Sequence, residues 1–152
     1  MGRTGSCQCG TIRYEVEGDS LALVFCQCTE CQKLSAGIGS YSMVLPREAL
    51  RIVSGEPRSW ERSSETGARN RAWMCPECGN RIFHENPDDP AMIRLKAGTL
   101  DDAAALEPDA LVWRRSAPAW MQAPEGVARF ESQPTPEEFF AAMTLFQGRA
   151  QR

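Results

Sequence analysis

The residues of this chain best suited to chemistry are its seven cysteines, which fall into three short groups. The groups are Cys7 with Cys9, then Cys26, Cys28 and Cys31, and finally Cys75 with Cys78. A C-x-x-C turn, or a C-x-C pair on extended backbone, presents two sulfurs to one ion, so such spacing is typical of metal sites. The odd number of cysteines argues against a complete disulfide framework. We therefore expect the cysteines to bind metal.

Seven thiolate ligands divide most simply into four and three. We expect a closed, structural zinc site made of Cys7, Cys9, Cys75 and Cys78, and a second zinc bound by Cys26, Cys28 and Cys31. Three ligands leave one coordination position open, as catalytic zinc sites do. Spacing alone also permits a swap in which Cys26 and Cys28 join Cys75 and Cys78. Buried free thiols, or a structural triplet completed by water, Glu or His, are the remaining alternatives.

Other side chains could assist such a site. Glu30 lies inside the triplet, and His84 is the only histidine of the chain. We expect Glu30 to be a solvated surface residue and His84 to be a packed or surface residue, not a ligand or base. Cations that could neutralise a thiolate-rich site or hold substrate carboxylates are Arg13, Lys33, Arg47, Arg69, Arg71 and Arg115.

Composition limits the possible classes of protein. The chain has 152 residues, 42% hydrophobic and 24% charged, which is ordinary for one globular domain, so we expect a single domain over 1–152. The net charge of −3 makes nucleic acid a poor default partner. No apolar run of 18 residues predicts a membrane span, and the first residues lack the apolar region of a secretion signal. We expect a cytoplasmic protein, and the pattern predicts no oligomeric state.

The elements that must position the cysteines are mostly short strands. Ile12, Tyr14 and Val16 alternate with polar residues, as in a half-buried strand, and the apolar run 21–25 leads directly into the triplet. Turn residues separate further strand candidates at 40–45, 50–53, 58–61, 71–74, 81–84, 92–96 and 111–114. This pattern predicts a mainly β fold.

One helix is expected, over 135–148. Thr135 can cap it, Pro136 suits the first helical position, and Glu138 completes a capping box. Four apolar residues at helical spacing should pack against the core, and Gly148 should end the helix. Those four are Phe139, Phe140, Met143 and Phe146. The proline-richer segment 117–136 is expected to be an ordered loop.

The motifs occur together in an order that is highly specific. They are Gly5-Ser6-Cys7-Gln8-Cys9-Gly10-Thr11-Ile12-Arg13-Tyr14, Cys26-x-Cys28-x-x-Cys31 with Ser35-Ala36-Gly37, Cys75-Pro76-Glu77-Cys78-Gly79, and Gly98-Thr99-Leu100-Asp101-Asp102. Over residues 3 to 130 this set resembles the glutathione-dependent formaldehyde-activating enzyme (GFA) and centromere protein V family. The resemblance implies a β-tent-like arrangement of antiparallel sheets around zinc, here followed by the C-terminal helix. It also implies the same division into a four-cysteine structural zinc and a three-cysteine catalytic zinc.

The activity implied by the resemblance is that of a carbon–sulfur lyase. In that reaction a small thiol such as glutathione condenses with an aldehyde to give an adduct such as S-(hydroxymethyl)glutathione. Two positions differ from the family pattern, because Gln27 and Leu111 stand where many members have histidine. The alternatives are a non-catalytic zinc module that binds a partner, and a thiol-redox enzyme of the methionine sulfoxide reductase kind. The redox alternative requires a reactive cysteine outside the metal sites.

Overall fold

The computed structural model describes residues 2–146, which gather into two compact units. The first unit contains residues up to 21 and residues 42–106, and the second contains residues 22–41 and those from 107 onward. The sequence predicts a single domain, and the division into compact units leaves that as a prediction.

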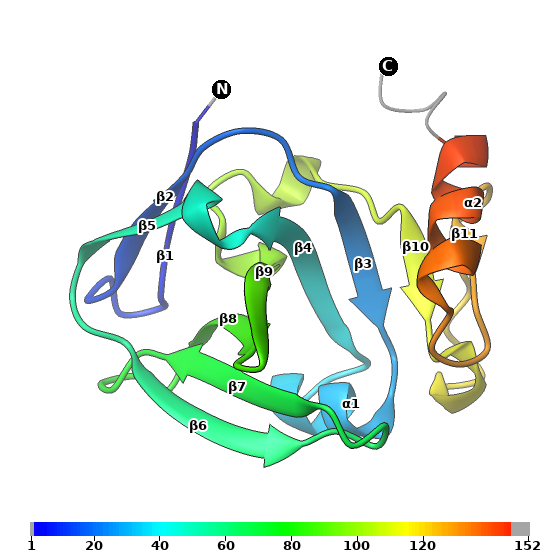
Figure 1. Cartoon of the computed structure of the whole chain (residues 1–152), viewed down its shortest axis with the longest axis horizontal. Coiled ribbons are helices and arrows are strands. Elements are labelled where there is room, and N and C mark those ends of the chain that lie inside the picture. The colour runs from blue at the N-terminus through cyan, green and yellow to red at the C-terminus, as the bar shows by residue number, and fades with distance from the viewer. Residues whose placement is uncertain (1, 147–152) are drawn as a thin grey trace. The chain divides into compact units, whose positions relative to one another are not determined.

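The first unit is built from antiparallel strands. A three-stranded sheet has the order β1 (Arg3–Ser6), β2 (Arg13–Val16), β5 (Leu50–Ser54). A second run of strands, visible in Figure 1, has the order β4 (Ser40–Pro46), β9 (Asp89–Lys96), β8 (Arg81–Asn86), β7 (Arg69–Met74), β6 (Arg58–Ser63). The 3₁₀ turn η1 (Arg47–Ala49) joins β4 to β5, and two more, η2 (Ala97–Thr99) and η3 (Ala103–Ala105), follow β9.

Alternation of side chains determines which residues form the core of this unit. On β2, Tyr14 and Val16 are buried while Arg13 is exposed, because successive side chains of a strand point to opposite faces. Gly5 lies where any Cβ would be 2.3 Å from the Tyr14 hydroxyl, so the absence of a side chain lets β1 lie close to β2. The fully buried side chains Ile12, Leu45, Ile82, Ile93 and Leu95 complete this core.

The second unit contains the cysteine triplet. Its strands are β3 (Ala22–Cys26), β10 (Ala110–Val112) and β11 (Ala128–Arg129), and its helices are α1 (Thr29–Ser35), the 3₁₀ turn η4 (Arg114–Ser116) and α2 (Pro136–Phe146). β10 lies between β3 and β11 and is parallel to both. Leu111 pairs with Phe25, and Val112 with Cys26.

The mainly β class and the C-terminal helix are confirmed, and four details differ from the expectation. The β3, β10 and β11 strands are parallel, whereas antiparallel sheets were expected. The triplet continues into a helix, α1, that apolar periodicity did not predict. The expected loop 117–136 contains the short strand β11. Phe140 is 59% exposed and not part of the core, while Phe139 packs near Phe130.

Two further observations complete the comparison. The expected stop at Gly148 lies outside the described residues. Within residues 2–146, no helix has the length and apolar character needed to cross a membrane.

Candidate metal centres

Four cysteines of the first unit converge on one point. The sulfurs of Cys7, Cys9, Cys75 and Cys78 all lie within 4.8 Å of one another. We call this group the four-cysteine cluster. Neighbouring sulfurs are 3.5 Å apart for Cys7 and Cys9, and 3.7 Å apart for Cys9 and Cys75. Four thiolates at about 2.3 Å from a tetrahedral ion lie about 3.8 Å from one another, so this spacing fits such an ion.

Tight turns hold these cysteines in place. The amide of Ile12 donates to the sulfur of Cys7, at 3.2 Å, and Gly10 closes the turn at a φ of 77°. The second turn is closed by Gly79, whose amide donates to the carbonyl of Cys75, at 3.0 Å, with a φ of 72°. Glycine adopts these left-handed conformations without steric cost, which explains why it follows each pair.

The two turns are joined to each other. The side chain of Asn80 accepts a hydrogen bond from the amide of Gln8, at 3.0 Å. Because Gln8 lies between Cys7 and Cys9, this contact fixes one turn against the other. Hydrogen bonds with the side chain and backbone of Thr11 lower the pKa of the Cys9 thiol to about 6. An ionised thiol is the form that binds metal.

The three cysteines of the second unit form a separate group. The sulfurs of Cys26, Cys28 and Cys31 lie within 4.8 Å of one another, and all three residues are half-buried. We call this group the cysteine triplet. Cys26 ends β3, Cys28 caps α1, and Cys31 lies in the first turn of α1. The amide of Cys31 donates to the sulfur of Cys28, at 3.3 Å, so a helix start brings two of the sulfurs together.

The triplet is electrostatically different from the four-cysteine cluster. Burial raises the pKa of the Cys28 thiol, and a hydrogen bond with Cys31 together with burial raises the pKa of Cys26. A bound cation opposes both effects, since it favours the thiolate form. Soft sulfur donors in threes and fours favour zinc or another thiophilic metal over calcium or magnesium. Both groups could therefore hold a metal ion, and together they account for all seven cysteines.

A buried amide supports the backbone of the triplet. Gln27 is fully buried, and its side-chain oxygen accepts a hydrogen bond from the Arg114 guanidinium, at 2.9 Å. The side-chain nitrogen of Gln32, on α1, donates to the carbonyls of Gln27, at 2.8 Å, and Ser116, at 2.7 Å. The amide of Gln27 donates to the carbonyl of Val112, at 3.0 Å. Strand, helix and η4 are thus tied together around Gln27.

Sequence reasoning noticed Gln27 only as a departure from the family pattern and missed this network. Arg114 is 87 residues away in the chain, so no local pattern could predict their contact. Leu111, the other departure, is buried on β10 beside Phe25. Together with Phe25 and Met121, Leu111 lines an apolar pocket of the second unit.

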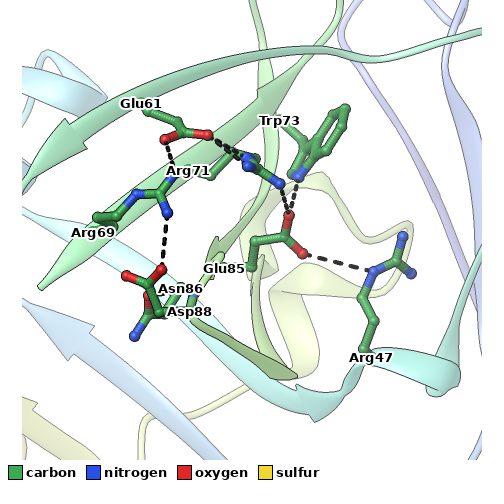
Figure 2. Close-up of polar contacts among 8 residues, drawn as sticks. All are labelled: Arg47, Glu61, Arg69, Arg71, Trp73, Glu85, Asn86 and Asp88. Atoms are coloured by element: carbon green, nitrogen blue, oxygen red, sulfur yellow. Dashed lines mark hydrogen bonds and ion pairs between the residues drawn. The ribbon is translucent and has the colours of Figure 1, made fainter.

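Several of the candidate cations are bonded to other groups of the first unit. Figure 2 shows that Arg69 bonds to Glu61 and Asp88, and that Arg71 bonds to Glu61 and Glu85. Both belong to the first unit, as does Arg47, whose guanidinium lies 5.1 Å from the centre of the Phe83 ring.

The other side chains considered as helpers of the metal sites differ in their exposure and contacts. Arg115 stacks over Trp113, at 4.7 Å. Lys33 is exposed in the last turn of α1, and Arg13 is exposed on β2. Glu30 is half-buried in the first turn of α1, more covered than the solvated position expected. His84 is buried on β8, as a packed residue.

Comparisons with known proteins agree with these observations. The sequence model of the family described as glutathione-dependent formaldehyde-activating enzyme matches residues 2–116. A crystal structure of a Rhodobacter sphaeroides protein is similar, with a TM-score of 0.51 and 22% sequence identity over 65% of this chain and 88% of that one. That likeness concerns the fold alone. The curated proteins include no match to this chain.

Proposed function

Because the chain belongs to the family of glutathione-dependent formaldehyde-activating enzymes, we propose that it is a zinc enzyme acting on carbon–sulfur bonds. It would join a small thiol, such as glutathione, to an aldehyde, or split the resulting adduct. The observation that supports this most is the pairing of a closed four-cysteine cluster with a separate triplet, to which the described residues add no fourth Cys, His, Asp or Glu ligand. Structural zinc sites have four protein ligands, whereas catalytic ones have three.

In this proposal the two groups have different tasks. The four-cysteine cluster would hold a structural zinc that contributes to folding, and the triplet would hold a second zinc. When bound there, zinc supplies Lewis-acid chemistry that lowers the pKa of a thiol in the open position. In the reaction, the thiol sulfur forms a bond to the carbonyl carbon, the carbonyl π bond breaks, and its oxygen takes the proton that the thiol gave up.

The protein's own residues would prepare the triplet for this task. Three thiolates and a divalent ion carry a net charge of −1, so a nearby cation stabilises the occupied site. Arg114 is held by Gln27, the residue between Cys26 and Cys28, so a guanidinium is fixed to this part of the chain. Arg114 has a second contact, to the carbonyl of Met121, at 3.3 Å, which reduces its freedom to move away.

The location of the cysteines supports this proposal over its rivals. A thiol-redox enzyme needs a reactive cysteine outside its metal sites, yet all seven belong to the two groups. A non-catalytic zinc module would need no incomplete triplet. That alternative predicts two zinc ions that resist chelation equally, whereas the proposed enzyme should lose one zinc to a mild chelator without unfolding.

The test is an exchange-NMR measurement of adduct formation. Zinc-loaded protein should accelerate the exchange between glutathione and S-(hydroxymethyl)glutathione in the presence of formaldehyde, compared with buffer. Cys28→Ser should lose this acceleration and keep its far-UV circular dichroism spectrum. Glu30→Gln, on the same helix and not a ligand, is the matched control and should keep most of the activity. Equal exchange rates for the wild type, Cys28→Ser and buffer would refute the proposal.

A further inference from the structure

The second unit contains an apolar pocket with a volume of about 280 Å³. We call it the aromatic pocket. The residues that line it are Phe25, Ile38, Tyr41, Leu111, Met121 and two prolines, Pro108 and Pro124. Leu111 is 1% exposed, whereas Pro124 is exposed, so the lining extends from β10 to the surface. None of the described residues that line the pocket is a cysteine or carries a charge.

The aromatic pocket and Cys26 lie on opposite sides of β3. Phe25 and Cys26 follow one another on this strand, so their side chains point to opposite faces. Leu111 pairs with Phe25 and therefore shares its face, and both residues line the pocket. The Tyr41 ring lies on the same side, with its centre 6.2 Å from that of Phe25. A molecule in the pocket is thus separated from the sulfur of Cys26 by the strand itself.

Hydrogen bonds hold two walls of the pocket in place. The side-chain nitrogen of Gln27 donates to the sulfur of Met121, at 2.7 Å, and the Arg114 guanidinium donates to the Met121 carbonyl, at 3.3 Å. On another wall, Asp109 follows a lining proline and is bonded to Leu23 of β3. The amide of Asp109 donates to the Leu23 carbonyl, at 2.8 Å, and its carboxylate accepts from the Leu23 amide, at 2.7 Å. Such a preformed pocket loses little free energy to ordering when it binds.

The size of the pocket and its aromatic lining select the shape of a ligand. Pockets for drug-sized molecules have volumes of about 300–1,000 Å³, so this one suits a single substituted ring and is too small for a tripeptide such as glutathione. Phe25 and Tyr41 already meet edge to face, and a third ring extends that favourable arrangement. The thioether of Met121 adds a favourable sulfur–aromatic contact.

The electrostatic surroundings exclude an anion. A charged group would lose its hydration without gaining a counter-charge from the lining. Burial raises the pKa of Tyr41 to about 12, and the negative charges of Asp109 and Glu107 contribute, so its phenol remains neutral. The same two carboxylates repel a negative ligand. The pocket therefore favours a ring that has no charge.

We propose that the aromatic pocket binds one small, uncharged aromatic molecule of the size of a single substituted ring. Burial of the ring against apolar side chains would drive binding, with a dissociation constant of about 1 mM or below. The inference goes beyond the proposed reaction and does not depend on it, because the site lies across β3 from Cys26.

Methionine NMR provides a direct test, because Met121 is one of six methionines and lines the pocket. Zinc-loaded protein with ¹³C-labelled methionine methyl groups would be titrated with benzyl alcohol. The Met121 signal, assigned with Met121→Leu, should shift and saturate. Met43, which is 2% exposed in the first unit, should not shift. Benzoate, the anionic counterpart, should bind at least about tenfold more weakly, and cyclohexylmethanol, which has no aromatic ring, should also bind more weakly.

Two matched variants locate the site. Ile38→Trp narrows the pocket and should weaken benzyl alcohol binding at least about fourfold, as the loss of one buried methylene group does. Val53→Trp adds the same indole at an exposed position of the first unit and should change the affinity less than about twofold. Far-UV circular dichroism checks that both variants fold.

The comparison of ligands uses the wild type and is valid whether or not the variants fold. The inference is overturned if benzyl alcohol gives no saturable Met121 shift, or if benzoate or cyclohexylmethanol binds equally well. Equal weakening by the two folded variants also overturns it. Glutathione exchange is measured on the same zinc-loaded sample, so a protein that binds benzyl alcohol and does not catalyse would refute only the proposed function.

Discussion

Acid should destabilise this protein through its buried histidine. In the native state the pKa of His84 is about 2, because burial and the charges of Lys96, Arg81, Arg62 and Arg94 all oppose its protonation. In the unfolded chain the pKa returns to its ordinary value of 6.5. Well above pH 6.5 both states are neutral at this residue, so His84 adds no pH dependence there. Below it the unfolded state binds a proton that the native state excludes, and stability falls with pH.

The size of the effect follows from the two pKa values. Each pH unit between them costs about 1.4 kcal/mol of unfolding free energy. From pH 7 to pH 5 the loss assigned to His84 is therefore about 2 kcal/mol. That is a large fraction of the stability of a typical domain.

The measurement is urea unfolding of the wild type and His84→Gln at pH 7, 6 and 5. Both proteins share the same cysteines and acidic groups, so metal release and carboxylate protonation cancel in the difference. The wild type should lose about 2 kcal/mol more than His84→Gln between pH 7 and pH 5. Parallel pH profiles of the two proteins would mean that His84 protonates in the native state, and the reasoning would be refuted.

Three further predictions concern the cysteine sites and their supports. Cys75→Ser should lower the thermal midpoint, measured by circular dichroism, much more than Cys28→Ser, because a structural zinc contributes folding free energy; equal midpoints would count against the assigned roles. Gln27→Leu should lower the free energy of unfolding, measured with urea, by about 1–3 kcal/mol, because it leaves buried partners unpaired. Gln8→Leu, at an exposed position, should lower it by less than about 0.5 kcal/mol. Gly39→Ala should lower the free energy of unfolding by about 1–3 kcal/mol, because the added Cβ would be 2.6 Å from the Cys26 carbonyl oxygen. Gly98→Ala should be nearly neutral, because its Cβ would meet no atom within 4 Å.

Local chemistry made part of this structure predictable. The capping box at Thr135 was read from four letters, and the structure contains both of its hydrogen bonds, between Thr135 and Glu138, at 2.8 and 3.2 Å. The strand at Tyr14 and Val16 follows from alternation in the same way. In each case the partners are near neighbours in the chain, so their spacing constrains the geometry directly.

Helix α1 shows why other parts could not be predicted. It has seven residues, none of them fully buried, so it lacks the apolar stripe that signals a helix. Its cap is Cys28, a residue type that is not among the usual capping residues. The spacing of the three cysteines predicted a metal site, but it did not predict the helix start that brings Cys28 and Cys31 together.

The grouping of cations on one side of β6 to β9 required information that no local pattern contains. Arg58, His84 and Arg94 come from three different strands, and their shared side depends on the register of β6 to β9. Moving one strand by a single residue would place its charges on the opposite face, among Glu61 and Glu85. Charge segregation at this sheet is therefore a property of strand pairing, which composition does not reveal. The net charge of −3 weighed against nucleic acid as a partner, yet it does not reveal which charges share one side of these strands.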